Sequence, residues 1–167
     1  RSEAQAAWIK QEIGDDLVYK TCRMPIKPIF GLCKLLWIRD NEPGAFARTA
    51  SWLNTADYIA FRLSGEKATD PSLASRTLCF DISKLDWSPT VLDKAGLAAG
   101  LMPPIHRSGT AIGPIRPDVS DQTGLPPSCT VSTGGHDHVC GALAVGVVSP
   151  GTVLNSLGTA EAVFLPT

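Results

Sequence analysis

The sequence predicts an α/β protein. Segments with apolar residues at helical spacing alternate with short apolar runs, and glycine or proline separates many of them. Two helices are expected near the N-terminus, with apolar faces formed by Ala4, Ala7 and Trp8 and by Leu32, Leu35 and Leu36. The second helix should end before the run Asn41-Glu42-Pro43-Gly44, which is typical of a turn.

A third helix is predicted after Asn54, because asparagine is a preferred residue at helix N-termini. Gly65 should end this helix, since glycine readily adopts the left-handed conformation found there. The buried face should show the spacing i, i+3, i+4, i+7, which is that of Ala56, Ile59, Ala60 and Leu63.

A fourth helix should begin at Ser88-Pro89 and stop at Gly96. Its buried residues would be Val91, Leu92 and Ala95. Residues 98–128 are rich in Pro and Gly, so they predict connecting segments with short strands around Ile105 and residues 111–112.

A carboxylate follows the next predicted strand. Residues 129–132 predict the strand, and Gly134-Gly135 allow a sharp turn after it. The small and apolar residues from Val139 to Leu143 then recur at helical spacing. Asp137 therefore lies at a strand-to-helix junction. A carboxylate there serves either as a helix cap or as a general base presented to a small polar substrate.

Residues 152–157 and 160–165 predict two strands joined by a tight hairpin turn at Gly158-Thr159. The amides and the hydroxyl of this turn could hold a phosphate, although an ordinary hairpin turn has the same sequence features. The turn lies a short distance along the chain from Asp137. Together, a base and a phosphate-binding turn favour phosphoryl transfer to a hydroxyl group.

The chain resembles the FGGY carbohydrate kinases over residues 30–167, where a series of motifs recurs in the order found in that family. The first motifs are Ser51-Trp52-Leu53-Asn54-Thr55-Ala56-Asp57-Tyr58-Ile59, Leu63-Ser64-Gly65-Glu66, Thr69-Asp70-Pro71-Ser72-Leu73-Ala74-Ser75-Arg76-Thr77 and Phe80-Asp81. The later ones are Trp87-Ser88, Gly96-Leu97, Pro103-Pro104, Ser108-Gly109, Gly113, Gly124-Leu125-Pro126, Gly134-Gly135-His136-Asp137 and Ser156-Leu157-Gly158-Thr159. Their joint order carries the resemblance.

The resemblance implies the actin-like ATPase (ribonuclease H-like) fold, in which two lobes surround a cleft. Residues 1–148 would form the later part of the first lobe, and residues 149–167 the first hairpin of the second lobe. Family members are much longer, so we expect a fragment of a homodimeric enzyme that is inactive by itself. It would lack the first phosphate loop, the Mg-binding acid and the adenine-binding region.

By the same resemblance, Asp137 is the expected general base, and Asp137 and His138 would bind a hydroxyl of the sugar or polyol. Gly158 and Thr159 would contact the transferred phosphate of ATP. Mg²⁺ would be held mainly by an acid that precedes Arg1, with Asp137 reaching it through water. The substrate stays open between a pentulose such as xylulose or ribulose, a related sugar, and a polyol.

Two other interpretations are open. His136, His138 and Cys140 could hold the zinc of a hydrolase if their segment were a strand, whereas a helix would place the two histidines on different faces. Alternatively, the intact protein could bind a sugar without catalysis, as a pseudokinase or regulator. The presence of Asp137 and of the Gly158-Thr159 turn argues against this second interpretation.

The composition excludes several other classes of function. With a net charge of -1 and charged residues at only 19%, the chain offers nothing that attracts nucleic acid or an anionic membrane surface. No apolar stretch reaches transmembrane length, so a cytoplasmic location is expected. The cysteines are odd in number and form no CxxC pair, which favours reduced, partly buried thiols: Cys22, Cys33, Cys79, Cys129 and Cys140.

Two structural roles are also predicted. Asp70 and Arg76 could line the mouth of the cleft, but an ion pair between them that holds their loop is the favoured interpretation. The tryptophans are expected mainly in packing, although one near the cleft could stack on a sugar: Trp8, Trp37, Trp52 and Trp87.

Overall fold

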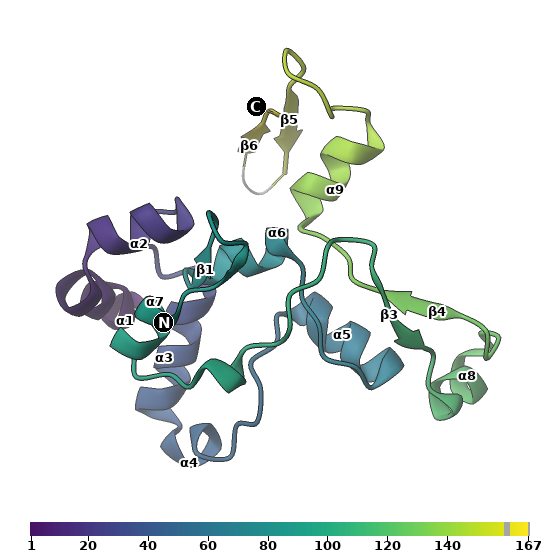
Figure 1. Cartoon of the computed structure of the whole chain (residues 1–167), viewed down its shortest axis with the longest axis horizontal. Coiled ribbons are helices and arrows are strands. Elements are labelled where there is room, and N and C mark those ends of the chain that lie inside the picture. The colour runs from purple at the N-terminus through teal and green to yellow at the C-terminus, as the bar shows by residue number, and fades with distance from the viewer. Residues whose placement is uncertain (159–160, 167) are drawn as a thin grey trace. The chain divides into compact units, whose positions relative to one another are not determined.

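The computed structural model describes residues 1–158 and 161–166 (Figure 1). The chain divides into two compact units, Arg1–Gly134 and Gly135–Thr167. We call them unit 1 and unit 2 and describe each by itself. Helices and short antiparallel strand pairs make up both units, which confirms the predicted α/β class.

Unit 1 begins with a group of helices. They are α1 (Glu3–Trp8), a π-helical turn (Ile9–Ile13), α2 (Asp15–Cys22), α3 (Gly31–Asn41) and α4 (Pro43–Phe46). The first and second predicted helices correspond to α1 and α3, and α3 ends at the predicted turn. The predicted face of the first helix is wrong, because α1 buries Gln5 and Ala6 while Ala4 and Ala7 are exposed. Helix α2 was not predicted, because it contains few apolar residues: its buried side consists of Val18, Thr21 and Cys22.

Helix α5 (Thr55–Ser64) confirms the predicted start and stop but not the predicted buried face. Asp57 is buried, whereas Ile59 is 54% exposed. The amide and the side-chain nitrogen of Asn54 both donate to Asp57 Oδ2, at 3.1 and 3.0 Å. This capping interaction turns Asp57 inward, so the more buried face follows residues 57, 60, 61 and 64. Burial raises the pKa of the Asp57 carboxyl.

The middle of unit 1 contains α6 (Pro71–Ala74), a 3₁₀ turn (Ser75–Thr77), the antiparallel pair β1 (Phe80–Asp81) and β2 (Asp86–Trp87), and α7 (Pro89–Lys94). Helix α7 agrees with the prediction. The amide of Val91 donates to Ser88 Oγ at 3.3 Å, and Val91, Leu92 and Ala95 are almost fully buried. Local signals were sufficient here because cap, proline and apolar face agree.

The rest of unit 1 comprises a 3₁₀ turn (Ala99–Leu101), β3 (Ala111–Pro114), α8 (Pro117–Thr123) and β4 (Thr130–Ser132). Strands β3 and β4 pair antiparallel, and Thr69 forms a parallel bridge with Ile105, as the predicted short strands require. Helix α8 was expected to be a connecting segment. It is short and polar, and it is marked only by Pro117 at its start and by Gly124 at its end.

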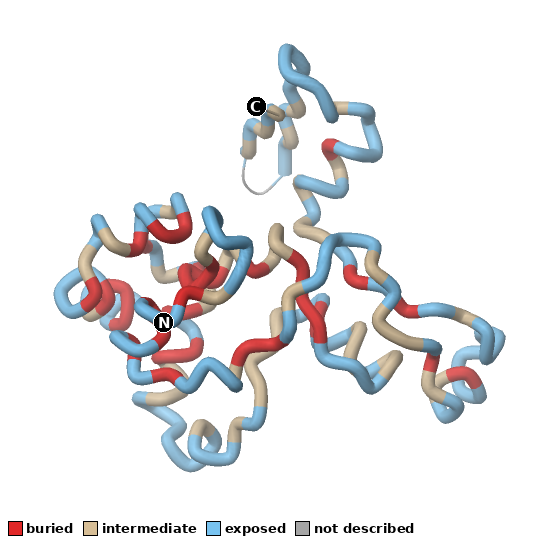
Figure 2. The backbone as a smooth tube through the Cα atoms, in the orientation of Figure 1, coloured by how far each residue is buried: buried red, intermediate tan, exposed pale blue. Residues whose placement is uncertain are grey.

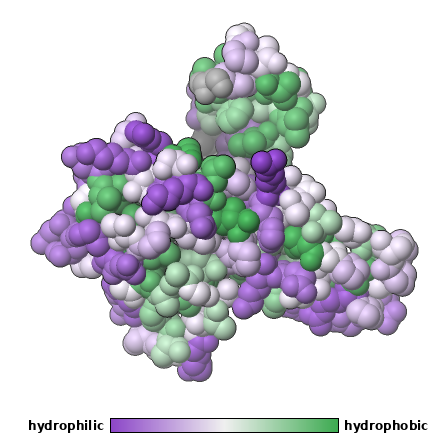
Figure 3. Space-filling view, in the orientation of Figure 1, coloured by the Kyte–Doolittle hydropathy of each residue, from purple (hydrophilic) through white to green (hydrophobic). Residues whose placement is uncertain are grey.

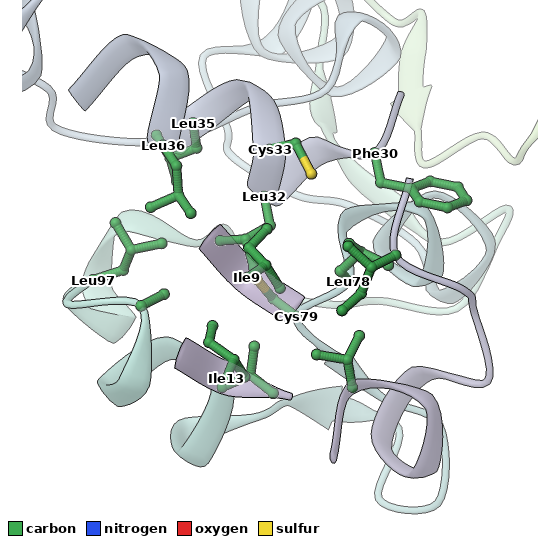
Figure 4. Packing of buried hydrophobic residues seen from close by; sticks show 14 of the residues in the cluster. Ile9, Ile13, Phe30, Leu32, Cys33, Leu35, Leu36, Leu78, Cys79 and Leu97 are labelled. Carbon is green, nitrogen blue, oxygen red and sulfur yellow. The ribbon is translucent and has the colours of Figure 1, made fainter. Parts of the chain in front are cut away.

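The core of unit 1 lies among α1, α3 and α7, and Figure 2 shows buried residues gathered in this helical part. Figure 4 shows side chains from distant segments meeting there, among them Ile9, Leu32, Leu36, Leu78 and Leu97. Each fully buried side chain of this kind contributes about 1.5–3 kcal/mol to folding. Trp8, Trp52 and Trp87 pack against the cluster, in agreement with their predicted role.

Asp70 is fully buried, but it does not form the predicted ion pair. Within the described residues, its Oδ1 accepts hydrogen bonds from the amide of Ser72 at 2.9 Å, from the Ser72 hydroxyl, and from Ser108 Oγ at 3.2 Å. Arg76 instead lies over the ring of Phe30, with its guanidinium carbon 4.9 Å from the centroid. The predicted pair was wrong because the start of α6 supplies Asp70 with amide and hydroxyl donors of its own.

Unit 2 consists of α9 (Asp137–Ala144), β5 (Leu154–Leu157) and β6 (Glu161–Phe164). The strands form the predicted antiparallel hairpin, with Leu154 opposite Phe164 and Leu157 opposite Glu161. Figure 3 shows apolar side chains on the surface of this unit, and Leu157 and Val163 are 75% and 62% exposed. No helix among the described residues has the length and hydrophobicity needed to cross a bilayer.

The five thiols are free and differ in exposure, which gives a testable prediction. Cys22, Cys33 and Cys79 are buried, Cys129 is half-buried and Cys140 is exposed. Burial raises the pKa of Cys33 to about 11. We expect a thiol-specific chromogenic disulfide at pH 8 to modify Cys140 first and the buried thiols only on unfolding, because thiolates are the reactive form.

The Cys140→Ser variant should lose the fast phase of this reaction. A fast phase that survives in Cys140→Ser would contradict the exposures described.

The raised pKa of Cys33 also makes the stability of the fold depend on pH. Folding raises the pKa of the Cys33 thiol above its ordinary value of 9.0. The contribution of this thiol to the free energy of unfolding is therefore fully present below pH 9 and is lost as the pH rises through about 11.

Candidate functional site

Asp137 is the first residue of α9, at the strand-to-helix junction predicted from the sequence. Along the chain, β4 ends at Ser132, residues 133–136 follow, and His136 caps the helix with an extended backbone conformation. A sharp turn that requires glycine at position 134 is not confirmed. The φ angle of Gly134 is not positive, and a Cβ atom built there meets no described atom within 4 Å. The extended His136, rather than a turn at Gly134, therefore leads the chain into α9.

The Asp137 carboxylate is anchored by neighbouring groups and is also exposed. Its Oδ1 lies 3.0 Å from His136 Nδ1 and accepts a hydrogen bond of 2.8 Å from the amide of His138. The Asp137 side chain is nevertheless 83% exposed. The start of a helix stabilises negative charge, as do both of these contacts. An anchored and accessible carboxylate is able to accept a proton from a substrate hydroxyl.

The contact between His136 and Asp137 was not predicted, because the sequence interpretation considered His136 only as a zinc ligand. The adjacent His-Asp pair was itself a usable signal, since an imidazole beside a carboxylate can donate to it. The expectation that a helix would separate the two histidines is also wrong. Helix α9 begins only after His136, and the rings of His136 and His138 lie 5.4 Å apart between centroids.

The zinc interpretation gains no support from the geometry. Among the described residues, no group of three or more His, Cys, Asp or Glu side chains is arranged to hold a metal ion. Tight structural zinc sites use four ligands, and catalytic ones use three. We therefore expect the purified protein to carry less than about one tenth of a zinc ion per chain by elemental analysis. One zinc per chain that disappears in His136→Ala would contradict this expectation.

The predicted phosphate-binding turn lies in the same unit as Asp137. Gly158 is exposed and follows β5 directly, while Thr159 falls outside the described residues. Leu157 pairs with Glu161 across the two strands that flank this predicted turn. An exposed glycine amide at the end of a strand is suited to contact a phosphate.

The two predicted site segments lie toward one end of unit 2. A Cβ atom built on Gly141, half-way along α9, would lie 3.9 Å from Leu154 Cδ2 at the start of β5. From there β5 runs back toward the end of the unit at which α9 begins (Figure 1). The fold of unit 2 therefore directs Asp137 and Gly158 to the same end.

The family follows from a comparison with known proteins. The model of the FGGY family of carbohydrate kinases, N-terminal domain, matches residues 1–144. The chain belongs to this family. The resemblance inferred from the motifs is thereby confirmed, and so is the actin-like ATPase fold that it implied.

Several FGGY kinases match nearly the whole chain. Xylulose kinase from Bacillus subtilis is 34% identical over 164 residues, which are 98% of this chain and 33% of that protein. Autoinducer-2 kinase from Klebsiella pneumoniae is 36% identical over 135 residues, or 80% of this chain and 25% of that protein. The crystal structure of xylulose kinase from Rhodospirillum rubrum superposes with a TM-score of 0.92 at 26% identity, covering 99% of this chain and 34% of that one. This chain thus spans a quarter to a third of the length of these relatives.

Proposed function

We propose that this chain is part of a carbohydrate kinase that transfers the γ-phosphoryl group of ATP to a hydroxyl of a sugar or polyol. The observation that supports this function most is the Asp137 carboxylate, which is anchored by His136 and the His138 amide yet remains 83% exposed. Membership of the FGGY family supports the same reaction class.

In the proposed reaction, Asp137 accepts the proton of the attacking hydroxyl while the O–P bond forms. An alcohol is a weak nucleophile at neutral pH, so a base within hydrogen-bond reach raises the rate. Phosphoryl transfer proceeds through a loose transition state, and the proton therefore leaves late. For this reason an ordinary ionised carboxylate is sufficient. His138, next to the base in sequence, would contribute to binding the sugar.

The other parts of the proposed site follow from the same assignment. Gly158 and Thr159 would contact the transferred phosphate, and an exposed glycine amide fits that role. Mg²⁺, when bound, neutralises charge on the phosphates; the Asp137 carboxylate fits a contact to it through water. Residues 1–148 would belong to the first lobe and residues 149–167 to the second. We also propose a cytoplasmic homodimer for the full-length protein.

The substrate that we propose is a ketopentose or a closely related sugar. Similar proteins from Bacillus subtilis and Rhodospirillum rubrum carry the name xylulose kinase, and this name supports a ketopentose. A catalytically inactive sugar-binding protein is the alternative, and turnover distinguishes it from the kinase.

A coupled assay of ADP release tests this function. The full-length protein should release ADP in a sugar-dependent manner with at least one member of a panel of ketoses, aldoses and polyols, xylulose and ribulose included. The 167-residue chain alone should be inactive, because catalysis needs base, phosphate loops, Mg²⁺ and nucleotide assembled in one site. Sugar binding by the full-length protein without any ADP release would favour the inactive binding protein instead.

A further inference from the structure

A polar cavity of about 350 Å³ lies in unit 1, where the starts of α3 and α5 meet the 3₁₀ turn that follows α6. Its chemistry is set mainly by Phe30, Lys34, Trp52, Thr55 and Arg76. These residues come from three separate segments of the chain. All of these residues belong to unit 1, whereas Asp137 belongs to unit 2.

The wall of this cavity carries two positive charges and no negative one. Lys34 and Arg76 line it, whereas none of the residues around it is Asp or Glu. Lys34 Nζ donates to Ser2 Oγ at 3.2 Å, and within the described ranges neither cation joins a carboxylate. Two cations that share a small cavity repel each other unless an anion lies between them. The cavity therefore favours an anionic ligand.

Packing holds Arg76 in place. Its guanidinium lies over the Phe30 ring, 4.9 Å from the centroid, and Figure 4 shows Phe30 beside the start of α3. The start of α3 approaches the turn of Arg76 closely, because a Cβ atom built on Gly31 would lie only 3.1 Å from Thr77 Cα. A guanidinium that is already oriented by stacking loses less entropy when its N–H groups bind an oxyanion. It also presents two donors in a fork that matches a carboxylate or a phosphate.

The remaining wall suits a hydroxylated carbon chain. Trp52 offers an aromatic surface, and Thr55 adds a hydroxyl group. The N-cap residue of the 11-residue helix α3 is Phe30, whose side chain makes no capping hydrogen bond, so the positive end of this helix adds to the charge of the two side chains. A cavity lined by cations, an aromatic surface and a hydroxyl group suits a sugar that carries an oxyanion.

We infer that this cavity binds a polyhydroxylated anion, a sugar acid or a sugar phosphate, with Arg76 and Lys34 holding its carboxylate or phosphate. A sugar acid supplies the oxyanion as a carboxylate, and a sugar phosphate supplies it as a phosphate ester. The oxyanion is common to both sources.

Isothermal titration calorimetry on the full-length protein tests this site, with gluconate, glycerol 3-phosphate, inorganic phosphate and the neutral xylitol as probes. We expect gluconate or glycerol 3-phosphate to bind at least about tenfold more tightly than xylitol, which lacks the charge-assisted hydrogen bonds. Binding of gluconate alone assigns a carboxylate ligand, and binding of glycerol 3-phosphate alone assigns a phosphate ester. If inorganic phosphate binds as tightly as either probe, the carbon chain has no part in recognition and the sugar assignment is wrong.

Arg76→Met keeps a long apolar side chain over Phe30 and removes the charge, so the affinity for the anion should fall about tenfold. Lys34→Met, on an exposed side chain, should weaken binding in the same direction without affecting the fold. Arg48→Met removes a positive charge from an exposed position outside the cavity and should leave the affinity unchanged. Equal affinities in Arg76→Met, Lys34→Met and the unaltered protein would overturn the assignment, as would the failure of both anions to bind.

The outcome is separable from that of the kinase proposal. Anion binding should persist in Asp137→Asn, because that variant leaves unit 1 unaltered. Loss of turnover with intact anion binding supports both proposals. Intact turnover in Arg76→Met, together with unchanged anion affinity, would contradict the proposed anion site and leave the kinase proposal standing.

Discussion

Asp137→Asn lowers the kcat of the full-length protein by about 100- to 10,000-fold, the range expected for the loss of a general base. Asparagine has nearly the same shape and its side-chain oxygen can still accept from the amide of His138, but it cannot take a proton from the substrate hydroxyl. Sugar binding should weaken far less than turnover. Steady-state ADP release and direct titration with the best sugar measure the two quantities.

Asp121→Asn is a matched control, because Asp121 is also an exposed carboxylate in a helix and lies in unit 1. It should leave kcat unchanged. Both substitutions affect exposed side chains, so each should change the free energy of unfolding by less than about 0.5 kcal/mol. A kcat near that of the unaltered protein in Asp137→Asn would show that Asp137 is not the base.

The second large effect concerns stability. Asp70→Ala should lower the free energy of unfolding by about 3 kcal/mol, because it removes the cap of α6 and leaves the Ser72 amide and the Ser108 hydroxyl without their acceptor. Asp70 is completely buried, so water cannot easily replace the lost acceptor. Urea unfolding followed by circular dichroism measures the change.

The Asp70→Asn variant tests whether stability depends on Asp70 as a hydrogen-bond acceptor or on its negative charge. The Oδ1 atom receives all the donors described, whereas Oδ2 has no hydrogen-bond partner among the described residues. Asparagine keeps one oxygen acceptor, so this variant should lose less than half as much stability as Asp70→Ala. Asp121→Ala, at an exposed position, should change stability little. An equal loss in Asp70→Asn and Asp70→Ala would mean that the negative charge itself is required.

The sequence predicted those elements whose local signals agree with one another. Ser88, Pro89 and the following apolar residues all indicated α7, and the hairpin strands showed clear turn signals. In α5 the signals conflicted: the apolar spacing favoured a face containing Ile59, but the capping interaction between Asn54 and Asp57 turned a different face inward. Helices α2 and α8 were missed because their buried sides are partly polar.

The candidate sites also combine features that the sequence predicted with features that it did not. The position of Asp137 between a strand and a helix follows from neighbouring residues, so the sequence predicted it. Arg76 was expected to pair with Asp70 but stacks on Phe30, 46 residues earlier in the chain. Contacts of this kind depend on how distant segments pack, and a local sequence pattern carries no information about them. The cavity between α3 and α5 was not predicted for the same reason.

The placement of Asp137 and Gly158 in one contiguous unit has a consequence for protein engineering. Because unit 2 begins at Gly135, a single crossover there would exchange the proposed base and the proposed phosphate contact as a block between members of this family. The cationic cavity of unit 1 would stay with the recipient. Chimeras joined at this point would thus show whether the proposed base and phosphate contact keep their function beside the cationic cavity of another family member.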